Sequence, residues 1–140
     1  MFSEIAEIKY IREQRLRILK REKELTRPIL LDYNLIPEIY TWFKECVVSN
    51  NISEKNTITQ RKKFLLVILW LYSPGSLAGD KMKPGLRDVV AKTLDIKQES
   101  VISRNCNSLV FTYRTYKYFR RDVDVIIEYI LSKIENTNHC

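Results

Sequence analysis

The chain has 140 residues, a formal net charge of +7 and three cysteines. This length is typical of a single domain with its own hydrophobic core, so the fold needs neither a disulfide nor a metal to hold it. The cysteines Cys46, Cys106 and Cys140 lack the paired spacing of zinc ligands, and the longest apolar run, 64–72, is far shorter than the roughly 20 residues of a bilayer span. We expect no metal site, no cofactor and no membrane span. The charged N-terminal segment, which has no apolar leader, predicts a cytoplasmic protein.

Residues 1–27 predict one long, highly charged helix, with Ser3 as its cap and Pro28 as its end, because the residue before a proline disfavours helix. Apolar side chains recur at roughly helical spacing on one side of it: Ile5, Ile8, Leu16 and Leu19. An apolar stripe on a terminal helix needs a surface against which to bury. We therefore predict that this segment is an oligomerisation arm for a homo-oligomer.

Residues 28–135 predict a single helical domain. Pro37 suits the first turn of its first helix, which ends at Asn50 and Asn51. The next helix opens at Thr57 or Thr59, and its run 64–72 is apolar on every side, which predicts the central helix of the core. Clustered glycine and proline residues in 73–85 then interrupt regular structure.

The C-terminal half predicts three more helices. They cover 86–94, about 98–118 and 122–134, and the tail 136–140 is expected to fray. Asp122 and Asp124 would open the last helix, where two acids favour the positive end of the helix dipole. The predicted fold is therefore all-α, a compact bundle of about six helices.

Residues 86–104 have the pattern of two helices joined by a short turn. Ala91 is small enough for the second helix to cross closely, and Leu94 and Ile96 fill the corner. The stretch resembles the helix-turn-helix superfamily of DNA-binding proteins, and a helix-turn-helix would span 86–115. That superfamily usually has glycine at the turn. This chain has Asp95, which tolerates the left-handed conformation less well than glycine does.

The branched side chain that anchors the second helix has two candidates. Counting from Ala91 favours Val101, whereas the helical wheel favours Ile102, because the wheel aligns it with other apolar side chains: Cys106, Leu109, Tyr113 and Tyr116. One extra residue in the turn would reconcile the two counts, and we expect Ile102 to face the core.

The resemblance implies that the chain binds double-stranded DNA and reads its major groove with the helix 98–116. With Ile102 inward, the base-reading face carries Ser100, Ser103, Arg104, Asn107, Ser108, Phe111 and Arg114. Arginine pairs with guanine and asparagine with adenine, each through two hydrogen bonds. The candidate phosphate contacts flank this helix: Lys81, Lys83, Arg87, Lys117, Arg120 and Arg121. Residues 80–121 contain ten basic and four acidic side chains, a net charge of +6 that suits a polyanion.

Residues 111–121, FTYRTYKYFRR, combine five aromatic rings with four cations. The helical wheel places Tyr113 and Tyr116 toward the core and Phe111 toward solvent or a partner. Tyr118 and Phe119 are expected to pack against the closing helix. Most of these rings are therefore predicted to be core residues.

Two settings suit such a DNA-binding protein: a small transcription regulator, or the DNA-recognition subunit of a phage packaging machine. The rival reading is a non-enzymatic helical module for protein interaction or assembly, whose basic block meets an acidic protein or RNA and whose Phe111 fills a partner's pocket. An exposed helix carrying Arg104 and Asn107 would favour DNA. No nucleophile with a base can be assembled from the sequence, so no catalytic residue and no enzyme activity are predicted.

Overall fold

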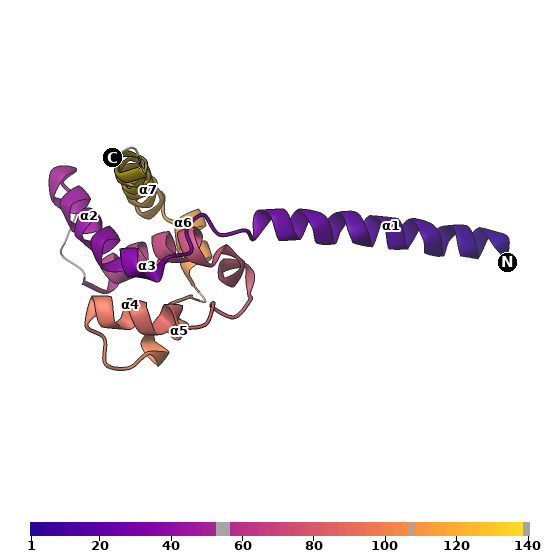
Figure 1. Cartoon of the computed structure of the whole chain (residues 1–140), viewed down its shortest axis with the longest axis horizontal. Coiled ribbons are helices and arrows are strands. Elements are labelled where there is room, and N and C mark those ends of the chain that lie inside the picture. The colour runs from indigo at the N-terminus through magenta and orange to yellow at the C-terminus, as the bar shows by residue number, and fades with distance from the viewer. Residues whose placement is uncertain (53–56, 107, 139–140) are drawn as a thin grey trace.

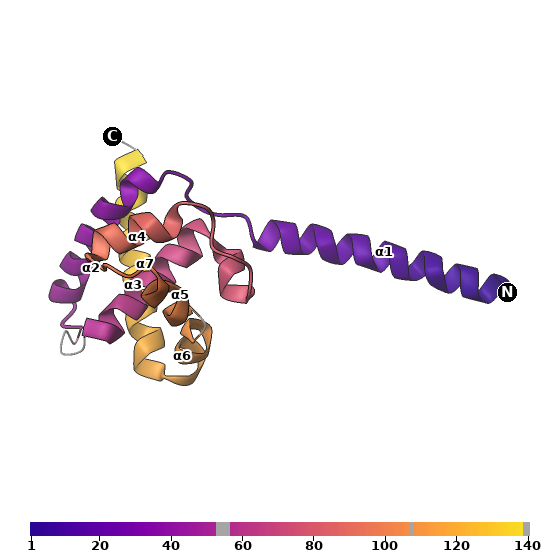
Figure 2. The ribbon, with the colours of Figure 1, turned by 90° about the horizontal axis from the view of Figure 1, so that it is seen from below.

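The computed structural model describes residues 1–52, 57–106 and 108–138. Within these ranges all regular structure is helical, which confirms the all-α class, but the α-helices number seven rather than about six. Figures 1 and 2 show a compact body from which the first helix projects as a straight arm. The α-helices are α1 (Phe2–Leu25), α2 (Ile36–Ser49), α3 (Thr57–Tyr72), α4 (Leu86–Leu94), α5 (Ser100–Cys106), α6 (Leu109–Thr115) and α7 (Lys117–Asn138), and two short 3-10 helices are η1 (Tyr33–Leu35) and η2 (Pro74–Ala78).

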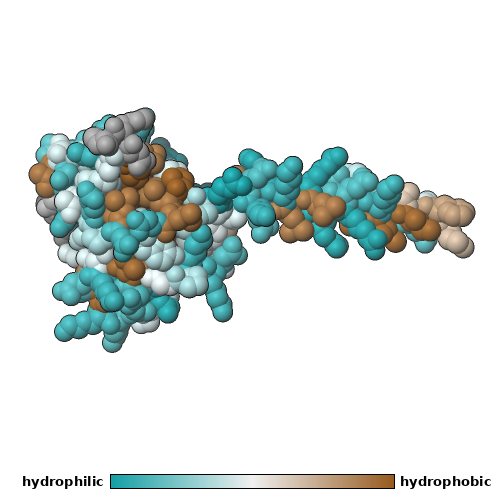
Figure 3. Space-filling view, in the orientation of Figure 1, coloured by the Kyte–Doolittle hydropathy of each residue, from teal (hydrophilic) through white to brown (hydrophobic). Residues whose placement is uncertain are grey.

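The arm α1 begins one residue before the predicted cap. Its N-cap is Met1, and no side chain caps it, so the prediction for Ser3 is wrong. It ends before Pro28 as predicted, and both the backbone amide and the hydroxyl of Thr26 donate to the Glu22 carbonyl, at 2.9 and 2.8 Å. No residue of α1 is buried, and Figure 3 shows apolar side chains along the lower side of the arm in that view.

The core is built around α3, as its apolar run predicts. Eight residues of the run are buried: Phe64, Leu65, Leu66, Val67, Ile68, Leu69, Leu71 and Tyr72. On one side, Phe64 meets two rings of α2, with centroid distances of 4.9 Å to Tyr40 and 5.4 Å to Phe43. The helix α2 has Pro37 in its first turn and Asn50 as its C-cap, as predicted. A helix that is apolar all round needs such neighbours on every side.

Backbone hydrogen bonds hold the segment between the arm and α2 against the end of α3. The amides of Ile29 and Leu30 both donate to the Leu71 carbonyl, at 2.8 and 2.9 Å. The hydroxyl of Tyr72 donates to the Asp32 carbonyl at 2.8 Å. Burial, followed by the nearby charge of Asp32, raises the pKa of Tyr72, so this phenol stays a neutral donor across the physiological range.

The last helix, α7, packs against α2, α3 and α6. It begins at Lys117, so Asp122 lies inside the helix and not in its first turn, and the dipole explanation is wrong. The Asp122 carboxylate instead pairs with the Lys63 ammonium of α3 at 2.9 Å. The other acid, Asp124, accepts a hydrogen bond of 2.6 Å from the Tyr113 hydroxyl. Where the sequence predicts a frayed tail, α7 remains helical to Asn138; residues 139–140 lie outside the described ranges.

Candidate nucleic-acid interface

The helices α4 and α5 are joined by the turn 95–99. Asp95 adopts the left-handed conformation, with φ 55° and ψ 46°, and the Ile96 amide donates to the Ala91 carbonyl at 2.8 Å, which closes the end of α4. Ala91 and Ile102 are buried, whereas Val101 is only half-buried. Ile102 is therefore the residue that faces the core, and the conformation expected of Asp95 is confirmed.

We predict that Asp95→Gly stabilises the protein. A non-glycine residue in the left-handed region carries a steric cost of about 1–2 kcal/mol that glycine avoids, although glycine loses more backbone entropy on folding. The free energy of unfolding, measured by urea titration, should rise by about 0.5 kcal/mol. Asp95→Ala is the control, because it removes the carboxylate and keeps the strain. Equal effects of the two changes would contradict the steric explanation.

The single reading helix predicted over 98–116 does not exist. The chain forms α5, which ends at Cys106, and α6, which begins at Leu109 with Ser108 as its N-cap, and Figure 2 shows them as distinct helices. Serine is a poor helix former because its side chain competes for backbone hydrogen bonds. Tertiary packing requires the break, since α5 packs on α3 and α4, whereas α6 packs on α3 and α7.

The break divides the predicted base-reading face between two helices. On α5, Ser100 and Arg104 are exposed, and Ser103 is half-buried. On α6, Phe111 and Arg114 are exposed. Ser108 is the N-cap residue of α6, and Asn107 lies outside the described residues. An exposed helix with Arg104 and Asn107 would favour DNA over a protein partner, and of these two residues the structure describes Arg104, which is exposed on α5. A base-reading helix in this region would therefore be α5.

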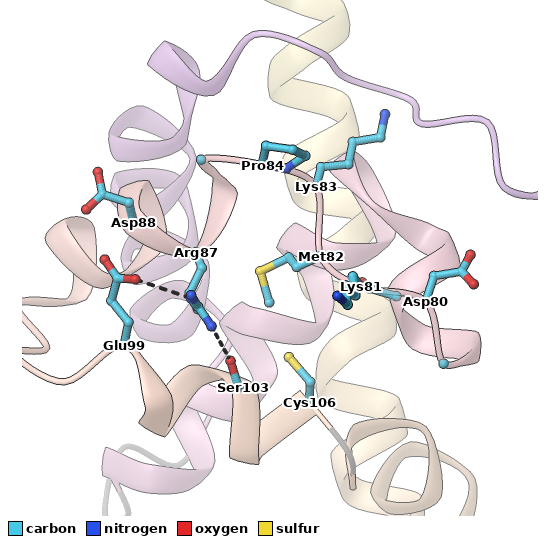
Figure 4. Close-up of a pocket in the computed structure, with 13 residues that line it drawn as sticks. Asp80, Lys81, Met82, Lys83, Pro84, Arg87, Asp88, Glu99, Ser103 and Cys106 are labelled. Atoms are coloured by element: carbon cyan, nitrogen blue, oxygen red, sulfur yellow. Dashed lines mark hydrogen bonds and ion pairs between the residues drawn. The ribbon is translucent and has the colours of Figure 1, made fainter.

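Three of the predicted phosphate residues line a pocket of about 570 Å³ between the 80–85 loop, α4 and α5. Lys81, Lys83 and Arg87 share it with three acids, Asp80, Asp88 and Glu99, so the formal charges of the lining cancel. In Figure 4, Arg87 points toward Glu99 and Ser103, while Lys83 extends away from them.

The contacts of Arg87 use much of its donor capacity within the protein. Its Nε donates to Glu99 at 3.2 Å, and an Nη donates to the Ser103 hydroxyl at 3.0 Å. The two side chains of the ion pair are half exposed, 50% for Arg87 and 40% for Glu99, so water screens the pair. This pocket is therefore a poor place for a phosphate.

The other three phosphate candidates lie together where α6 meets α7. Lys117, Arg120 and Arg121 line a shallow depression of about 320 Å³, together with Asp124 and Glu128. All three are exposed, as is Arg114 at the end of α6. Within the described part of the chain, no carboxylate lies within ion-pair distance of any of these four cations. We call the exposed residues of this region, 111 and 114–121 without Phe119, the basic corner.

The rings of FTYRTYKYFRR are mostly outside the core, which corrects the prediction. Phe111, Tyr116 and Tyr118 are 66%, 51% and 69% exposed, and only Phe119 is buried. Phe111 points outward as predicted, but the predictions for Tyr116 and Tyr118 are wrong. The wheel assumed one continuous helix, whereas α6 ends at Thr115 and α7 begins at Lys117, so the phase of the wheel is lost at Tyr116. The run Asn105 to Ser108 was the signal in the sequence for the division between α5 and α6.

Other chemistry in the described residues is sparse. No group of three potential metal ligands occurs among them, and none of their helices is long and apolar enough to cross a membrane. Burial raises the pKa of the Cys46 and Cys106 thiols, so neither is activated as a thiolate. Comparison with family models, curated proteins and solved structures gives no match to this chain.

Proposed function

We propose that this chain binds double-stranded DNA. The observation that carries the proposal is the basic corner, in which Arg114, Lys117, Arg120 and Arg121 are exposed and have no ion-pair partner among the described residues. Cations paired within a protein have less free energy to gain from phosphate, whereas unpaired exposed cations release the counterions of the nucleic acid when they bind it. The corner would hold the DNA backbone.

In this proposal, α5 is the helix that reads the DNA sequence. Ser100 and Arg104 are exposed polar side chains of this helix, and among the described residues Arg104 makes a single, long hydrogen bond of 3.4 Å to the carbonyl of Ser100, so it is available to a guanine. The resemblance to a helix-turn-helix supports this assignment. The function proposed is that of a small cytoplasmic regulator or a phage-type DNA-recognition subunit, with duplex DNA and a second copy of the chain as partners.

The test is fluorescence anisotropy of the full chain with a random-sequence duplex across a salt series. Binding should weaken with salt, and Arg120→Ala/Arg121→Ala should lower the slope of log K against log[salt] by about 2, because each lost phosphate contact removes about 0.9. The matched control, Arg27→Ala/Lys44→Ala, removes the same charge from exposed positions elsewhere and should leave the slope nearly unchanged.

A third variant tests the pocket. Lys81→Ala/Lys83→Ala should change the slope less than the loss of Arg120 and Arg121, since acids surround these lysines. Equal effects of all three variants would mean that net charge alone governs binding. Absence of duplex binding at low salt would contradict the proposal that the chain binds DNA.

A second candidate function rests on the exposed rings. Phe111, Tyr116 and Tyr118 place three large apolar or amphipathic groups on the surface, and such rings are the usual anchors of protein interfaces. A helical assembly component would use them to enter pockets of a partner. Failure of duplex binding, together with loss of a protein complex in Phe111→Ala/Tyr118→Ala, would favour this candidate over DNA binding.

A further inference from the structure

The arm α1 is a 24-residue helix whose apolar side chains are not buried against any described part of the chain. Nine large hydrophobic residues of the helix are between 47% and 83% exposed: Phe2, Ile5, Ile8, Tyr10, Ile11, Leu16, Ile18, Leu19 and Leu25. Helices in water gain most of their stability from packing an apolar face, and α1 buries none of its residues. We therefore expect α1 to be stabilised by packing its apolar side chains against a second surface.

Four of these apolar residues lie on two lines with a seven-residue spacing. Ile11, Ile18 and Leu25 form the first line, and Ile8 begins the second, which continues with the charged Arg15 and Glu22. Two lines at this spacing form the seam of a two-stranded coiled coil. The surface that fits such a seam best is another helix of the same kind.

The charges of α1 favour one direction for the pairing of two such helices. Residues 1–13 carry three acidic and two basic side chains, a net −1, whereas residues 14–25 carry five basic and two acidic side chains, a net +3. A parallel pair would place Arg15 against Arg15 and Glu22 against Glu22 across the seam, and like charges there are unfavourable. An antiparallel pair places the acidic half of each helix beside the basic half of the other and aligns their dipoles favourably.

We infer that α1 pairs with α1 of a second copy of this chain as an antiparallel two-stranded coiled coil. This inference gives an orientation and a seam to the self-association included in the proposed function, and it does not depend on DNA binding. A helix of 24 residues is about 36 Å long at 1.5 Å per residue. The two bodies would therefore be held at opposite ends of a rod, and each dimer would present two basic corners.

The first experiment measures the mass of the full chain by sedimentation equilibrium, without nucleic acid. We expect twice the monomer mass of 16.7 kDa. Ile11→Lys/Ile18→Lys should convert the dimer to a monomer at the same concentration, because it places charges in the seam. The matched control, Ala6→Lys/Tyr10→Lys, adds the same charge to the opposite side of the helix and should remain dimeric.

Unfolding of the body, followed by the fluorescence of Trp42 and Trp70, verifies that each variant is folded. At a chain concentration of about 100 μM, only an association weaker than about 5 kcal/mol would escape detection. A monomer at this concentration would overturn the pairing and indicate that a different protein is the partner of the arm. A dimer that survives the seam variant would place the interface elsewhere, which also overturns the inference.

The second experiment determines the direction. A spin label at Ser3→Cys is introduced in a Cys106→Ser/Cys140→Ser background, while Cys46 is retained because it is fully buried. Antiparallel helices separate the two labels by about 30 Å or more, whereas parallel helices, whose axes are about 8–10 Å apart, bring them close together. A short distance in a stable dimer would refute the antiparallel arrangement. Loss of salt-dependent duplex binding with the dimer intact would count against the DNA proposal alone.

Discussion

Asp122→Ala should destabilise the protein by about 3 kcal/mol, because it leaves a buried ammonium without its counterion. The Lys63 side chain is only 5% exposed and the Asp122 side chain 18%, and their charged atoms are 2.9 Å apart. The pair joins α3, at the centre of the core, to α7. Urea unfolding monitored by tryptophan fluorescence measures the loss, with the slope against urea concentration expected to be unchanged.

A double variant separates the cost of an unpaired charge from the value of the pair. Lys63→Met/Asp122→Ala removes both charges and keeps an apolar stem of similar length, so it should be less destabilised than Asp122→Ala alone. Lys92→Ala is the matched control. It breaks an ion pair with Asp88 at a similar distance, 3.1 Å, but the side chains are 77% and 50% exposed, and the change should be within about 0.5 kcal/mol. A double variant less stable than the single one would contradict the argument.

Phe64→Ala should cost about 4 kcal/mol, the largest stability loss that we predict. Phe64 is fully buried between Tyr40 and Phe43, and removing its ring leaves a cavity that two rigid rings cannot easily fill. Thermal unfolding should shift to a markedly lower midpoint, and urea unfolding gives the free energy directly.

The chain contains its own control for this prediction. Phe111→Ala deletes the same ring from a side chain that is 66% exposed, and its effect on stability should be within about 0.5 kcal/mol. If the two changes cost the same, then Phe111 would be buried against a second surface in solution. That result would favour the interface role of the exposed rings over a role in contacting DNA.

The two regions that were expected to hold phosphate differ in their acids. The pocket that contains Lys81, Lys83 and Arg87 is lined by as many carboxylates as cations, and Arg87 is held by Glu99 and Ser103. The depression at the basic corner is lined by three cations and two acids, and one of these acids, Asp124, already accepts the Tyr113 hydroxyl. The net charge of +6 over residues 80–121 could not separate these two regions, because the acids near the first are distributed over a loop, α4 and the turn 95–99.

Local pattern alone determined a large part of this protein. The composition and spacing of 64–72 identified the central helix, because a run that is apolar on all sides can only be stable inside a core. Pro28 and Pro37 marked helix ends through restrictions on their own backbone or their neighbour's, and Asn50 did so because its side chain competes for backbone hydrogen bonds. The small Ala91 indicated a close crossing of α4 and α5, with Leu94 and Ile96 at the corner. Each of these signals acts within a few residues of where it is read.

Only the tertiary structure decided which surface the basic and aromatic residues of 98–121 form. A helical wheel carries its phase forward, but α6 ends at Thr115 and α7 begins at Lys117, and Tyr116 and Tyr118 lie on the surface and not at their predicted core positions. The start of α7 at Lys117 also places Asp122 inside that helix, where it meets Lys63, 59 positions earlier in the chain. Contacts at such a separation depend on how helices pack, and the free energy of packing is not encoded in any local spacing.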